Sequence, residues 1–116
     1  MTIPAGTARA APASLSVAFS DGIPRRLTIT VPPGPSGLLG FQVAQSGQAI
    51  IPRTPGAFVI ADDRVIQWDL DGYPDAGRYS IIGYNTDLYD HTLYVEFEVD
   101  ELTAPARKPL TILPIG

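Results

Sequence analysis

The sequence contains no cysteine, which excludes disulfide bridges, thiolate metal sites and thiol catalysis. Small secreted domains often need disulfides, so the absence of cysteine favours folding in a reducing cytoplasm. Charged residues are also scarce, at 17% of the 116 residues. This low charge suggests that part of the surface is buried against a partner, although a plain soluble domain is also compatible with it.

Basic residues are few and scattered, and the formal net charge is −4. The largest basic clusters are Arg25–Arg26 and Arg107–Lys108, whereas nucleic-acid binders carry a basic face that neutralises phosphates. We therefore expect neither nucleic acid nor an anionic membrane surface as a partner. No window approaches the roughly 18 apolar residues of a membrane span. The first 14 residues do not resemble a signal peptide, because they hold a single arginine and no long apolar run.

Long stretches without glycine or proline are rare, because 11 glycines and 12 prolines punctuate the chain. This spacing argues against helices. Apolar and polar residues alternate instead, most clearly at Leu93, Val95, Phe97 and Val99, and a period of two predicts strands. The predicted strands cover about 13–20, 26–31, 39–43, 49–51, 57–61, 65–70, 78–85 and 93–99. Seven to eight short strands with regular turn signals are typical of an antiparallel β-sandwich.

The length is that of a single domain. We expect the sandwich over residues 13–102, flanked by an N-terminal arm at 1–12 and a C-terminal arm at 103–116. Both arms are rich in Ala, Pro and Thr and lack alternation. In the C-terminal arm we expect apolar anchors that add a strand to the sheet edge of a neighbouring subunit, namely Leu110, Ile112, Leu113 and Ile115.

The segment Asp75-Ala76-Gly77-Arg78-Tyr79-Ser80-Ile81 resembles the D-x-G-x-Y-x-C signature that begins strand F of immunoglobulin domains. The resemblance implies that Gly77 lets the backbone turn between sheets. It also implies that the Tyr79 ring packs under the corner, with its hydroxyl bonded to the loop backbone. Ile81 stands in place of the family's second cysteine, where apolar packing would replace the bridge. Other sandwiches and small barrels remain alternatives.

Two aromatic residues depart from the immunoglobulin pattern. Trp68 lies in the predicted strand 65–70, whereas the family's core tryptophan is on strand C. Phe41 would have to serve in that position. We expect both Trp68 and Tyr79 to lie in the core.

Residues that could carry chemistry lack partners at a suitable spacing. The single histidine, His91, has no nucleophile or second metal ligand near it in sequence, and we expect a loop histidine. Asp69, Asp71 and Asp75 suggest a calcium loop, but the third alternating oxygen residue and the distal glutamate are missing, so a turn is expected.

Glu96 and Glu98 share one face of a predicted strand. Paired carboxylates occur in glycoside hydrolases, but on an outward strand face we expect them to be solvated and to discourage aggregation. We therefore expect a protein that is not an enzyme and that holds no metal or cofactor.

Tyrosines are the better candidates for binding. Tyr84 and Tyr94 are expected on outward faces of the last two predicted strands, with Tyr89 in the loop between them. Exposed tyrosines can form a protein interface or a surface on which a sugar stacks. Ordinary partly buried positions are the alternative for all three.

The runs Pro35–Phe41, Ile51-Pro52, Gly83–Asp87 and Tyr89–Thr92 resemble small virion proteins of actinobacterial tailed phages. Such phages often use immunoglobulin-like domains on capsids and tails. The resemblance implies a structural component of the virion, such as a capsid decoration, connector or minor tail protein. It would be made in the host cytoplasm and bind other virion proteins in many copies with symmetry. The alternative is a module that binds a host receptor or surface glycan through its tyrosines.

Overall fold

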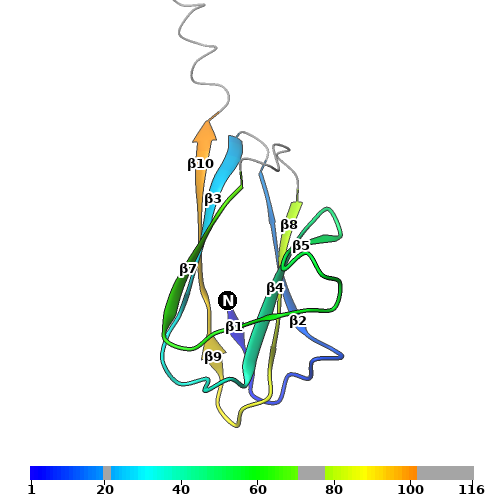
Figure 1. Ribbon diagram of the computed structural model, residues 1–116, viewed down its shortest axis with the longest axis vertical. Coiled ribbons are helices and arrows are strands. Elements are labelled where there is room, and N and C mark those ends of the chain that lie inside the picture. The colour runs from blue at the N-terminus through cyan, green and yellow to red at the C-terminus, as the bar shows by residue number, and fades with distance from the viewer. Residues whose placement is uncertain (20–21, 71–77, 102–116) are drawn as a thin grey trace, which may run out of the picture.

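The computed structural model describes residues 1–19, 22–70 and 78–101, and this part of the chain is all β with no helix (Figure 1). The prediction of a β-sandwich is confirmed. The strands are β1 (Thr2–Ile3), β2 (Ala13–Ala18), β3 (Gly22–Val31), β4 (Leu39–Gln45), β5 (Gln48–Ile51), β6 (Val59–Ile60), β7 (Arg64–Asp69), β8 (Arg78–Asn85), β9 (His91–Thr92) and β10 (Tyr94–Glu101).

Two antiparallel sheets form the layers of the sandwich. The first has the order β10-β3-β7, and the second has the order β2-β8-β4-β5, with β6 also paired to β4. We call them the three-stranded and the five-stranded sheet. The short pair β1-β9 bridges the two sheets along one side of the sandwich. β9 leads into β10 of the three-stranded sheet, and β1 contacts β8 of the five-stranded sheet.

The strand order agrees with the immunoglobulin pattern at the centre and departs from it at one edge. In that pattern strand B pairs with E, and C pairs with F, as β3 does with β7 and β4 with β8. The outer strands are exchanged. The early strand β2 adjoins β8, and the last strand β10 adjoins β3, so each lies in the sheet where the pattern places the other.

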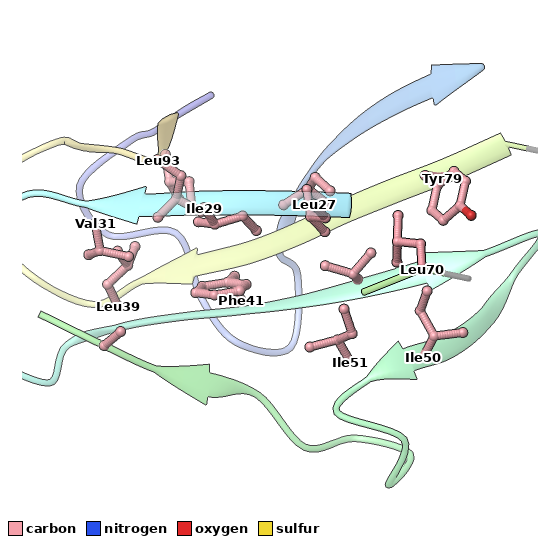
Figure 2. Close-up of a cluster of buried hydrophobic side chains, with 14 residues drawn as sticks. Leu27, Ile29, Val31, Leu39, Phe41, Ile50, Ile51, Leu70, Tyr79 and Leu93 are labelled. Carbon is pink, nitrogen blue, oxygen red and sulfur yellow. The ribbon is translucent and has the colours of Figure 1, made fainter. Parts of the chain in front are cut away.

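The core fills the space between the two sheets (Figure 2). Alternate residues of β3 and β4 point into it, as the period of two predicted. The fully buried side chains of these rows are Leu27, Ile29, Val31, Leu39, Phe41 and Val43. Trp68 is partly buried and meets Phe41 edge to face, with ring centroids 6.0 Å apart. Phe41 therefore takes the central aromatic position on β4, with Trp68 packed against it from the opposite sheet.

Tyr79 is the second residue of β8 and is fully buried, as expected. Its ring contacts Phe19 and Phe97 at centroid distances of 5.9 and 5.4 Å, and Gln45 Nε2 donates to its hydroxyl at 3.4 Å. Ile81 is also fully buried, so apolar packing occupies the position of the family's second cysteine. The other two residues of the signature, Asp75 and Gly77, lie outside the described residues.

The N-terminal segment differs from the expected arm. Ile3 is fully buried, and the Met1 amine donates to the Leu93 carbonyl at 2.9 Å. The physical reason is that Gly83 has no side chain, so the Ile3 side chain can occupy the place that a Cβ would take. Residues 1–3 are thus part of the sandwich. The C-terminal arm, with Leu110, Ile112, Leu113 and Ile115, lies outside the described residues.

We expect Gly40→Ala to lower the free energy of unfolding by about 1–3 kcal/mol, the usual effect of overpacking. The Tyr84 ring lies directly over Gly40, and an added Cβ would overlap it. The measurement is urea unfolding. The same substitution in a Tyr84→Ala background should have a much smaller effect, and equal effects in both backgrounds would contradict the explanation.

Candidate functional site

The loop between β8 and β9, residues 86–90, carries the most exposed large apolar side chains of the described chain. Leu88 is 86% and Tyr89 is 71% exposed. The loop lies at one end of the sandwich, the bottom of Figure 1, and we call it the 86–90 loop. Exposed apolar side chains are unfavourable in water. A loop that holds them in a fixed conformation is therefore a candidate contact surface.

Asn85 holds the loop from its core side and is fully buried. Its Nδ2 donates to the carbonyls of Ile3 and Tyr89, at 3.0 and 2.8 Å. Its Oδ1 accepts the backbone N–H of Asp87 at 3.0 Å. One side chain thus joins the N-terminal segment, the end of β8 and both sides of the 86–90 loop.

Asp87 and His91 hold the loop from within. His91 Nε2 donates to Asp87 Oδ2 at 2.8 Å, since a carboxylate can only accept, and the backbone N–H of Leu88 donates to Asp87 Oδ1 at 2.7 Å. These two bonds, first that from His91, hold the pKa of Asp87 below its usual value. The His91 ring also lies against the backbone of Gly34.

Neighbouring segments fix the loop from outside. Ala5 N–H donates to Asp90 Oδ1 at 2.8 Å, and Gly6 N–H donates to the Asp87 carbonyl at 3.2 Å. Thr86 N–H donates to the Leu38 carbonyl at 2.9 Å. The backbone that carries Leu88 and Tyr89 is therefore hydrogen-bonded to several neighbouring segments. The loop has less conformational entropy to lose when a partner binds.

The three candidate tyrosines do not form one surface. Tyr94 is exposed on the outer face of the three-stranded sheet, and Tyr89 is exposed in the 86–90 loop. Of the two alternatives for Tyr84, the exposed binding position is wrong, because the residue is only 5% exposed. Its ring does face outward from β8, but Phe58 packs edge to face on it at 4.9 Å and the Arg9 guanidinium lies 5.5 Å from its centroid.

The acidic residues considered for chemistry lie apart from this loop. Glu96 and Glu98 are exposed on the outer face of the three-stranded sheet, where Glu98 lies 3.6 Å from Arg26. Among the residues that the structure describes, no three His, Asp or Glu side chains gather as metal ligands. Asp71 and Asp75 lie outside that part. The described segments also contain no helix with the length and apolar character needed to cross a membrane.

Leu88 was missed by sequence reasoning, which considered only the tyrosines of this segment. The available signal is a leucine in the otherwise polar stretch Asn85-Thr86-Asp87 and Asp90-His91. An apolar residue inside a turn-rich polar run has no strand periodicity to bury it. Asn85 gave no such signal, because a polar residue at a strand end is ordinary.

Comparison with protein-family models, with curated proteins and with solved structures finds no match for this chain. Function is therefore inferred from the geometry of the described residues.

Asn85→Ala should lower the free energy of unfolding by about 2–3 kcal/mol, because it leaves the buried carbonyl of Ile3 and that of Tyr89 without their donor. Urea unfolding measures the loss. Thr86→Ala is the matched control, since it removes an exposed hydrogen bond to the Leu38 carbonyl. We expect it to change stability by less than about 0.5 kcal/mol. Equal losses in the two variants would contradict a central role for Asn85.

Asp87→Asn should destabilise the protein at neutral pH and have less effect in acid. A carboxyl whose pKa is lowered by folding contributes stability above its ordinary value of about 4, and this contribution is lost as the pH falls through the lowered pKa. The wild type should therefore exceed Asp87→Asn in urea midpoint at pH 7, and the gap should narrow near pH 3. A gap that is independent of pH would contradict this account.

Proposed function

We propose that this chain is a non-enzymatic structural component of a bacteriophage virion that docks on neighbouring subunits through its 86–90 loop. The observation that carries the proposal is the pair Leu88 and Tyr89, two exposed side chains on a backbone fixed by hydrogen bonds. Tyrosine is enriched among residues that dominate binding energy, and a preorganised backbone lowers the entropic cost of binding.

Two further observations support this reading. The segments that resemble small phage virion proteins, Gly83–Asp87 and Tyr89–Thr92, are the ones that build and hold the 86–90 loop. Tyr94 and Val65 are also exposed, and both pair with Thr30 across the three-stranded sheet. This row is a second apolar surface suited to contacts in an assembly of many copies.

The alternative of a module that binds a glycan has weaker support, because the tyrosines lie on different faces. A hollow of about 630 Å³ with a mixed polar and apolar lining does lie on the outer face of the five-stranded sheet. Ser14, Ser80 and Gln42 line it with hydroxyl and amide groups suited to sugar hydroxyls. Glycan binding that is lost in Gln42→Ala and kept in Tyr89→Ala would favour this alternative.

The test is quantitative mass spectrometry of particles purified from the phage that encodes the chain. We expect the chain in a fixed copy number per particle. Leu88→Asp should reduce that copy number at least about thirtyfold, the equivalent of a 2 kcal/mol hot spot, because a carboxylate cannot be buried unpaired in the contact.

Ile60→Asp is the matched control, since Ile60 is also an exposed apolar residue but lies on β6. It should be incorporated like the wild type. Wild-type incorporation of Leu88→Asp would contradict docking through the 86–90 loop. Absence of the chain from purified particles would contradict the virion role itself.

A further inference from the structure

Each sheet of the sandwich ends in strands that have no partner on their outer side within the described residues. These edges are β2 on one side of the five-stranded sheet and β5 with the two-residue β6 on its other side, and β10 and β7 in the three-stranded sheet. An unpaired edge presents free N–H and C=O groups that can accept a further strand. Proteins usually protect such edges with charge, proline or short length.

Three of the four edges are protected in this way. β10 carries Glu96, Glu98 and Asp100, and β7 carries Arg64 and Asp69 at its two ends. β5 has only four residues and is followed directly by a proline. A strand added at β5 would therefore gain few hydrogen bonds.

The edge of β2 has no such protection. Its six residues, Ala-Ser-Leu-Ser-Val-Ala, include no charge and no proline. Leu15 and Val17 face the interior, because they pair with the fully buried Ile81 and Tyr79 of β8. Leu15 is nevertheless 36% exposed.

The exposure of Leu15 shows that this side of the sandwich is open. The β10 edge lies across from β2, since Phe19, which follows β2, packs against Phe97 of β10 at a centroid distance of 5.0 Å. On β10, Val99 is 38% exposed. An apolar strand added to β2 would cover Leu15 and complete the layer.

The chain carries an apolar segment outside its described part. After β10, Leu110-Thr111-Ile112-Leu113 forms an uncharged run between Pro109 and Pro114. Residues 102–109 separate it from β10 and can span at most about 28 Å, enough to leave the parent domain. Prolines confine a strand to an edge, because they offer no N–H to a second neighbour.

We propose that residues 110–113 of one copy add as a strand to the β2 edge of a second copy. This inference rests on the proposed role in a multi-subunit assembly and names the contact between copies. Each copy holds one donor segment and one acceptor edge, so the contact is head to tail and can repeat around a ring or along a filament. A four-residue strand makes few hydrogen bonds, so each contact is weak and the degree of self-association depends on the chain concentration.

The test uses the full chain and two variants in sedimentation velocity over a range of concentrations. Leu15→Lys places an inward-pointing charge on the acceptor edge, the device by which natural edges block pairing. Ile112→Lys places a charge in the donor. We expect the wild type to form concentration-dependent oligomers and each variant to self-associate at least about tenfold more weakly.

Mixing the two variants gives the decisive result. Leu15→Lys retains its donor and Ile112→Lys retains its acceptor, so an equimolar mixture should form a one-to-one complex that stops at two chains. A monomeric wild type, a Leu15→Lys chain that assembles like the wild type, or a mixture without complex would each overturn the proposal. If thermal unfolding shows that Leu15→Lys does not fold, Ser16→Lys takes its place in the test. This variant puts the charge on the exposed outer face of the same strand.

Two controls separate this inference from the proposed docking loop. Ile60→Lys changes an exposed apolar residue on β6, on the side of the five-stranded sheet away from β2, and should leave self-association unchanged. Leu88→Asp should abolish incorporation into particles yet leave self-association intact. Loss of self-association in either control would overturn the assignment of the β2 edge. A result in which Leu88→Asp is incorporated like the wild type, with self-association as expected, would contradict only docking through the 86–90 loop.

Discussion

The buried amide of Asn85 is the interaction on which one end of this sandwich depends. It holds the Ile3 carbonyl on one side and the Tyr89 carbonyl on the other, and it accepts the N–H of Asp87. An amide with all these bonds made is stable in the interior, whereas the same group without partners would be costly. Because Asn85 ends β8, the position of the core strand fixes the position of the loop.

This dependence explains why the 86–90 loop can display Leu88 and Tyr89. Loops without internal bonds fold exposed apolar side chains back onto the protein or sample many conformations. Here the bond between Asp87 and His91 and the hydrogen bonds from residues 5 and 6 restrain the backbone of the loop. The N-terminal segment therefore supports the loop as well as closing the side of the sandwich.

The strands and core could be predicted from sequence because their signal is local. The bounds of β8, Arg78–Asn85, agree with the alternating run, and the inward rows of β3 and β4 are those that the period of two indicates. The exchange of β2 and β10 could not be predicted, since alternation shows which face is buried but does not name the neighbouring strand.

The candidate site was predicted only in part for the same reason. The sequence placed Tyr84 on an outer face correctly, but its burial comes from Phe58 and Arg9, which lie 26 and 75 positions away along the chain. The pairing of Thr2 with Thr92 joins the N-terminus to the segment before β10, and a two-residue strand leaves no periodic pattern. Contacts between segments far apart in sequence decided what the local pattern could not.

The attachment of Met1 to Leu93 has a mechanical consequence. Leu93 directly precedes β10, so the N-terminus is held at one end of that strand while the described chain leaves from the other end at Glu101 (Figure 1). A pulling force between these two points acts along β10. The load passes from Met1 through its bond to Leu93 and the two-residue pair β1-β9 into the backbone of β10, so it does not reach the ladder between β10 and β3 until these few bonds break. Tension between the two points would therefore detach residues 1–3 first and leave the two sheets paired as they are.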